Sequence, residues 1–69
     1  MKAVCIFEPR GDHGLEGYQA GDCYQAERVA KNEKHKQDYY RVWPAETTWP
    51  NYYETCSVGV FNKYFEIVG

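Results

Sequence analysis

The sequence lacks the features of a secreted, membrane-spanning or strongly charged protein. Eight Lys and Arg residues stand against ten Asp and Glu, a formal net charge of -2, which excludes a generally basic nucleic-acid coat and a highly charged disordered chain. No apolar run approaches the roughly 20 residues of a transmembrane helix. The run that starts at Met1 ends at Glu8, too early for a secretory leader. We therefore expect a cytoplasmic protein without a membrane partner.

Cysteine is scarce and widely spaced, which excludes two common ways of stabilising a small domain. Cys5, Cys23 and Cys56 are an odd set without a CxxC pair, so the sequence shows neither a disulfide framework nor clustered zinc ligands. His13 and His35 lie far from any pair of cysteines in the sequence. We predict three reduced thiols that behave as small apolar residues, no metal site and no cofactor.

Groups that could perform catalysis are equally sparse. Asp12 and His13 are adjacent in a glycine-rich loop, but no nucleophile is recognisable near them, and a catalytic site needs converging groups. The glycines at positions 11, 14 and 17 lack the Lys-Ser/Thr and helix-start pattern of a phosphate-binding loop. We expect no enzymatic activity and no catalytic residue.

Aromatic side chains are what the chain has in excess. They make up 17% of the 69 residues and include seven tyrosines, which suits a pleated, half-exposed surface. Short β-forming runs alternate with turn signals and predict one domain, residues 1–69. The expected strands cover residues 2–8, 23–30, 38–43, 51–57 and 64–68, with a solvated hairpin tip at 31–37 and a compact turn at 58–63.

A helix over residues 20–37 is the competing interpretation of the middle of the chain. Tyr24, Val29 and Ala30 form only a ragged apolar stripe there, which is a weak helical pattern. Five short strands favour instead an all-β fold, a small five-stranded barrel. Alternation along the third and fifth strands defines the expected core, which consists of Tyr40, Val42, Phe65 and Ile67.

The order of these landmarks resembles that of a Src-homology-3 barrel over almost the whole chain. The matching stretches are Ala3-Val4 before a long loop, Gly21-Asp22, Tyr39-Tyr40-Arg41, Gly59-Val60-Phe61 and Tyr64-Phe65-Glu66-Ile67-Val68. The resemblance implies a Src-homology-3-like fold. It does not extend to that family's proline-peptide groove, because the first strand has no tyrosine, the first loop has only Asp12 and Glu16 as acids, and the last turn has no proline.

A second resemblance concerns three short stretches of the sequence. The opening Met1-Lys2-Ala3-Val4-Cys5-Ile6, the centre Tyr39-Tyr40-Arg41-Val42 and the ending Phe61-Asn62-Lys63-Tyr64-Phe65-Glu66-Ile67 are similar to those of small uncharacterised proteins of tailed bacteriophages and prophages. This resemblance implies a phage or prophage accessory protein in the cytoplasm of a bacterial host. It supplies no activity.

Aromatic and arginine side chains around the third expected strand carry the best functional signal. Alternation places Tyr39, Arg41 and Trp43 on one face of the strand, and Trp49, Tyr52 and Tyr53 flank the next loop. Because such residues dominate binding hot spots, we predict that a protein partner is bound by Tyr39, Arg41, Trp43, Trp49 and Tyr52. We also predict that Tyr39, Arg41, Trp43 and Trp49 stay at least partly exposed. The alternative is that the rings cover a thin core. The chain is expected to be a monomer or a weak dimer.

Binding of single-stranded nucleic acid on the same barrel is the second hypothesis. Residues 25–43 carry five basic against three acidic side chains, and small barrels bind single strands with a basic groove and stacking aromatics. Tyr39 and Trp43 would stack on bases. Phosphate contacts would come from Arg28, Lys31, Lys34, Lys36 and Arg41.

Overall fold

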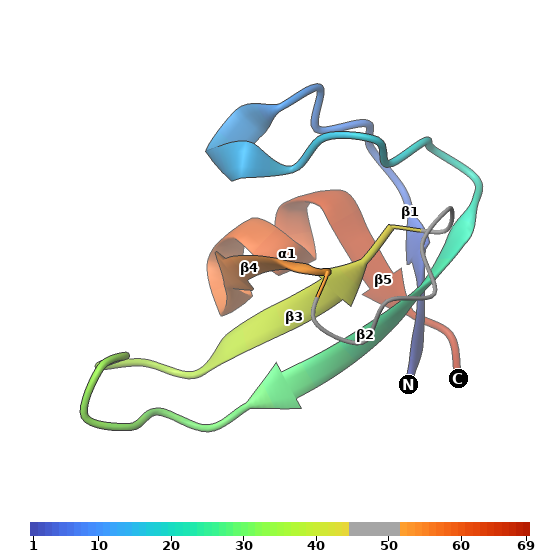
Figure 1. Ribbon diagram of the computed structural model, residues 1–69. Coiled ribbons are helices and arrows are strands. Elements are labelled where there is room, and N and C mark those ends of the chain that lie inside the picture. The colour runs from blue at the N-terminus through green and yellow to red at the C-terminus, as the bar shows by residue number, and fades with distance from the viewer. Residues whose placement is uncertain (45–51) are drawn as a thin grey trace.

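The computed structural model describes residues 1–44 and 52–69, and strands make up most of its regular structure (Figure 1). In chain order the elements are β1 (Lys2–Cys5), the 3₁₀ turn η1 (Asp12–Gly14), β2 (Cys23–Val29), β3 (Tyr39–Trp43), β4 (Glu54–Ser57), the helix α1 (Val58–Tyr64) and β5 (Phe65–Ile67). No helix in these two ranges is long and apolar enough to cross a membrane.

All five strands belong to one antiparallel sheet in the order β4-β3-β2-β1-β5. The chain ends run side by side at one end of the sheet (Figure 1), where the Lys2 amide donates to the Gly69 carbonyl at 2.9 Å. The expected all-β fold with five strands is therefore confirmed, with one short helix added. Closure of the sheet into a barrel stays a prediction.

Alternation along the two central strands separates a buried face from an outer face, as predicted. Tyr24 and Ala26 on β2 are buried, and so are Tyr40 and Val42 on β3. Ala26 lies directly opposite Val42 in the ladder, so the buried side chains of both strands point to the same side of the sheet. No helix forms over residues 20–37, because this stretch is instead β2 and the loop after it.

The loop between β1 and β2 covers the buried face of the sheet together with α1 (Figure 1). This first loop, residues 6–22, places Leu15 and Tyr18 in the hydrophobic core. The Tyr18 ring packs edge-on against Tyr24 and Phe65, with ring centroids 5.0 and 5.5 Å apart. Its hydroxyl donates to the Val42 carbonyl at 2.8 Å. Burial raises the pKa of this phenol, so it stays a neutral donor.

The compact turn expected at residues 58–63 is an α-helix, α1. Its N-cap is Ser57, whose hydroxyl accepts a hydrogen bond from the Val60 amide at 3.2 Å, a common way to satisfy a first-turn donor. Phe61 and Tyr64 are both buried, and their three-residue spacing puts them on one helix face. The Phe61 ring stacks on Tyr40 with centroids 3.7 Å apart. Burial of this face against the sheet extends the turn into a helix.

The placement of Ile67 in the core is wrong. Phe65 is 2% exposed, whereas Ile67 is 43% exposed. The two side chains alternate onto the same side of β5, but Ile67 lies opposite Ala3 near the chain ends, at the end of an edge strand. The Tyr18 and Phe61 rings pack against Phe65. Alternation therefore identified the face of Ile67 correctly but not its burial.

Truncation of Phe65 and of Ile67 should have very different effects on stability. Phe65→Ala removes a ring packed among Tyr18, Tyr24 and Phe61, and should lower the free energy of unfolding by about 3–5 kcal/mol. Ile67→Ala removes an exposed side chain and should cost about 1 kcal/mol or less. Urea unfolding followed by circular dichroism measures both. Equal losses for the two variants would contradict this assignment of the core.

Candidate protein-binding face

The outer face of β3 carries an arginine and a tryptophan that both contact one tyrosine ring. Arg41 and Trp43 alternate with the buried Tyr40 and Val42, and are therefore directed away from the core. The Arg41 guanidinium lies over the Tyr53 ring at 5.0 Å. The Tyr53 and Trp43 rings are 5.2 Å apart at an interplanar angle of 55°. We call Arg41, Trp43 and Tyr53 the aromatic face.

Four of the five side chains predicted to bind a partner fall within the described residues, and two of them, Arg41 and Trp43, belong to this face. Both are half-buried. Tyr52 is 54% exposed, but it alternates with Tyr53 and therefore falls on the other side of the chain. Trp49 lies outside the described residues.

Tyr39 is the exception, because the prediction that it is exposed is wrong. It points to the outer side of the sheet, opposite Ser57, yet only 8% of it is exposed. The loop that follows β2 returns the His35 imidazole onto the Tyr39 ring, with centroids 4.0 Å apart and an interplanar angle of 28°. Burial here comes from the loop rather than from the core.

Tyr53 is a member of the aromatic face that the predicted site omitted. It precedes β4 and shares the outer side with Thr55 by alternation. Since Thr55 lies opposite Arg41 in the ladder, Tyr53 comes next to Trp43. The alternation of residues 53, 55 and 57 was the available signal in the sequence.

The two arginines of the basic middle segment are engaged with acids. Arg28 and Asp38 form an ion pair at 3.1 Å, and Arg41 and Glu27 one at 3.6 Å. Asp38 also accepts from the Lys31 amide at 2.9 Å. The hydrogen bond from the Lys31 amide is the main reason that the pKa of the Asp38 carboxyl lies below its ordinary value, and the Arg28 contact is the second.

The tip of the first loop is held against α1 by polar contacts. The Tyr64 hydroxyl donates to the Asp12 carboxylate, and the Lys63 ammonium lies 4.0 Å from it. His13 Nε2 is 3.9 Å from the other carboxylate oxygen of Asp12. The Tyr64 hydrogen bond is the main reason that the pKa of Asp12 lies below its ordinary value.

The three thiols do not pair, and the two buried ones are poor nucleophiles. Cys5, Cys23 and Cys56 are all free, with Cys5 and Cys56 buried and Cys23 exposed. Burial raises the pKa of the Cys56 thiol to about 11, and it also raises that of Cys5, so both stay protonated near neutral pH. Within residues 1–44 and 52–69 no three His, Cys, Asp or Glu side chains gather as a metal site would require.

Comparison of the chain with protein-family models, with curated proteins and with solved structures finds no match.

The Asp12 contact predicts a specific acid sensitivity. A carboxyl whose pKa is lowered in the folded state stabilises the fold at every pH above its unfolded-state pKa, which is about 4 for aspartate. This contribution is lost as the pH falls through the folded-state pKa. We expect the free energy of unfolding to decline on acidification below about pH 4, and the decline to be smaller in Asp12→Asn.

The matched control is Asp22→Asn, since the Asp22 carboxylate is exposed and makes no hydrogen bond to another described residue. Urea midpoints between pH 2 and 7 measure the difference. A decline of the same size in Asp12→Asn and in wild type would contradict the contribution of this contact.

Proposed function

We propose that the protein is a small non-enzymatic binding module that holds a protein partner through the aromatic face. The observation that carries this proposal is the contacting series Arg41–Tyr53–Trp43 on the outer side of β3 and β4. Tyr, Trp and Arg are the side chains that most often supply binding energy at protein interfaces. None of the three belongs to the hydrophobic core cluster.

The geometry favours binding because contacts within the protein already hold the series in place. Arg41 is held by Glu27 on one side and by the Tyr53 ring on the other. Binding usually restricts the rotamers of long side chains at the interface, and this restriction costs free energy. A partner that packs on Tyr53 and Trp43 would therefore meet a surface with little rotamer freedom left to lose.

We further propose that the sheet curls into a Src-homology-3-like barrel and that the protein is a phage or prophage accessory factor in the bacterial cytoplasm. Support for the barrel comes from the pairing of β1 with both β2 and β5 and from the long first loop over the core. The phage proposal rests on the sequence resemblance alone.

Binding of single-stranded nucleic acid is the second candidate function. It is favoured by Lys34 and Lys36, which have no ion-pair partner among the described residues. Against it, Arg28 and Arg41 are paired with Asp38 and Glu27. A groove that follows a nucleic-acid backbone needs several cations in a row, and two of the five expected ones are already neutralised.

Trp43→Ala should remove partner binding while leaving the fold intact. Trp43 lies outside the core cluster, so its truncation should lower the free energy of unfolding by about 1 kcal/mol, much less than Phe65→Ala. Affinity capture from bacterial lysate, with wild type and variant as bait, measures the binding. The matched control is Phe7→Ala, which removes another exposed ring, 63% accessible and away from β3.

A protein that is captured by wild type and by Phe7→Ala, and lost with Trp43→Ala, supports the proposal. Equal capture by all three baits, or unfolding of Trp43→Ala as severe as that of Phe65→Ala, would sink it. Titration of labelled single-stranded DNA at low salt tests the second candidate, since phosphate contacts are strongest there.

A further inference from the structure

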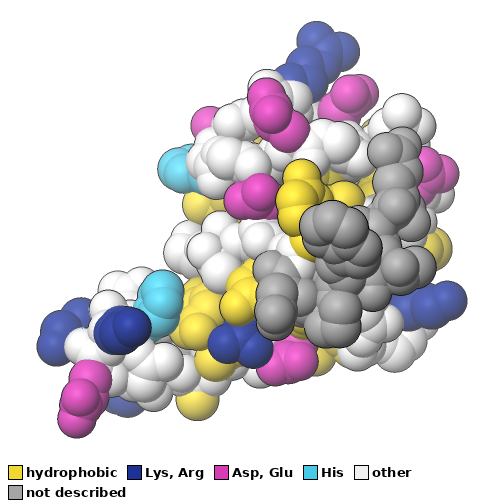
Figure 2. Space-filling model, viewed as in Figure 1, with side chains coloured by type: hydrophobic (Ala, Val, Ile, Leu, Met, Phe, Trp, Pro, Cys, Tyr) yellow, Lys and Arg dark blue, Asp and Glu magenta, His cyan; other side chains and the backbone are white. Residues whose placement is uncertain are grey.

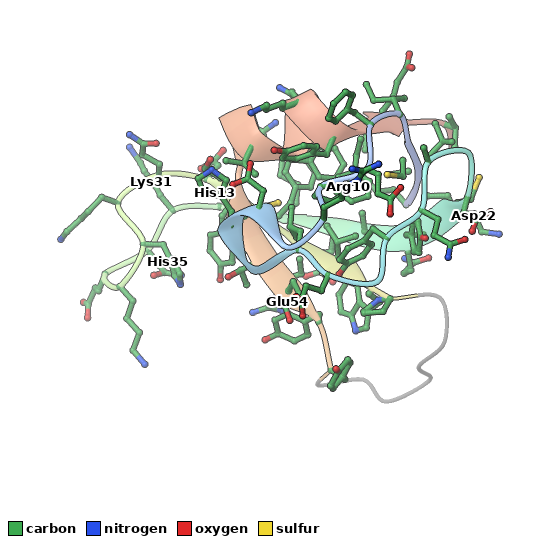
Figure 3. All side chains as sticks on the ribbon, turned by 90° about the horizontal axis from the view of Figure 1, so that it is seen from above. Arg10, His13, Asp22, Lys31, His35 and Glu54 are labelled. Carbon is green, nitrogen blue, oxygen red and sulfur yellow. The ribbon has the colours of Figure 1, made fainter. Side chains whose placement is uncertain are left out.

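A recess of about 580 Å³ opens beside the first residue of β3 and the end of β4. Its walls come from the loop between β2 and β3, from the start of β3, from η1, from residues 55–57 of β4 and from the first turn of α1. Figure 2 shows the two histidines, in cyan, above and below a hollow at the left of the molecule. Figure 3 places His13 on the first loop and His35 on the loop between β2 and β3.

The walls of this recess are rich in positive charge. Lys34 and Lys36 line it and form no ion pair with any described acid. The one acid among the described lining residues is Asp38, which is already bound by Arg28 and by the Lys31 amide. An anion that enters therefore meets two ammonium groups and a carboxylate whose charge is compensated.

Neutral donors line the recess on its β4 wall. Thr55 and Ser57 are exposed and line the recess from the outer face of β4. The Ser57 oxygen accepts from the Val60 amide, which leaves its hydroxyl proton available to donate. Ammonium and hydroxyl donors around one concavity match a phosphate group, whose several oxygens accept strong charge-assisted hydrogen bonds.

The recess also offers a flat aromatic surface and is larger than a phosphate ion needs. The His35 ring stacks on Tyr39, and His35 itself is exposed. A planar base packs well on such a ring. The volume of the recess lies in the range of small-molecule sites, about 300–1,000 Å³. A ligand that fills it thus combines a phosphate with an aromatic body.

We propose that this recess binds a mononucleotide, with its phosphate on Lys34 and Lys36 and its base on His35. A nucleic-acid strand fits less well, because both arginines of the basic segment are paired with acids and the unpaired lysines are confined to the loop beside the recess. The structure supplies cations for one phosphate group rather than for a backbone. The proposal is independent of the protein partner of the aromatic face.

Nuclear magnetic resonance titration of the full chain with AMP tests the proposal at low salt. AMP should cause saturable shifts of amide signals at His13, His35 and Ser57, and inorganic phosphate should compete with it. Adenosine, which lacks the phosphate, should bind at least about tenfold more weakly. The variant Lys34→Gln/Lys36→Gln should weaken AMP binding by about tenfold or more.

The matched control is Lys2→Gln/Arg10→Gln, which removes two exposed positive charges outside the recess and should leave AMP binding unchanged. No saturable shift up to millimolar AMP would overturn the proposal, as would equal binding of AMP and adenosine. Equal weakening in the two double variants would also overturn it. Tighter binding of a single-stranded oligothymidylate than of AMP at these residues would assign the recess to nucleic acid instead.

Discussion

The return of the first loop onto the sheet is the constraint on which the rest of this structure depends. A five-stranded sheet by itself is one layer, and one layer cannot enclose a core. The first loop supplies the missing cover through Leu15 and Tyr18, and the Tyr18 hydroxyl joins the loop to the Val42 carbonyl at 2.8 Å. The Asp12–Tyr64 contact ties the same loop to α1. Sheet, loop and helix thus close around one set of aromatic rings.

The hydrophobic core lies on one side of the sheet, and the outward-facing side chains of β3 do not belong to the core cluster. Tyr40 and Val42 hold the strand in the fold, while Arg41 and Trp43 face outward beside Tyr53. The recess continues from this surface, since Thr55 and Ser57 follow Tyr53 on the same side of β4. The proposed protein site and the proposed nucleotide site are therefore two ends of one outer face.

The arginines of residues 25–43 form ion pairs within the fold, whereas Lys34 and Lys36 line the recess. Arg28 joins Asp38 at the loop end of the β2–β3 hairpin, and Arg41 joins Glu27 across the ladder between the same strands. Exposed pairs of this kind contribute little stability, but they occupy the guanidinium groups. The positive charge left without such pairs in this segment belongs to lysines of the loop, and it gathers where that loop borders the recess.

The sequence by itself determined what depends on neighbours along the chain. Alternation is local, so the strands and the separate faces of Tyr40 and Arg41 could be predicted, and so could the exposed hairpin tip.

Burial, in contrast, depends on which distant segments pack against a face. Only the tertiary structure decided that His35 covers Tyr39, that the end of β5 leaves Ile67 exposed, and that a glycine-rich loop carries Tyr18 into the core. The same holds for α1, whose turns are stabilised by stacking of Phe61 on Tyr40, and for the recess, whose walls lie far apart in the chain. Contacts between distant segments form only when the whole chain folds, and they cannot be predicted from short-range sequence patterns.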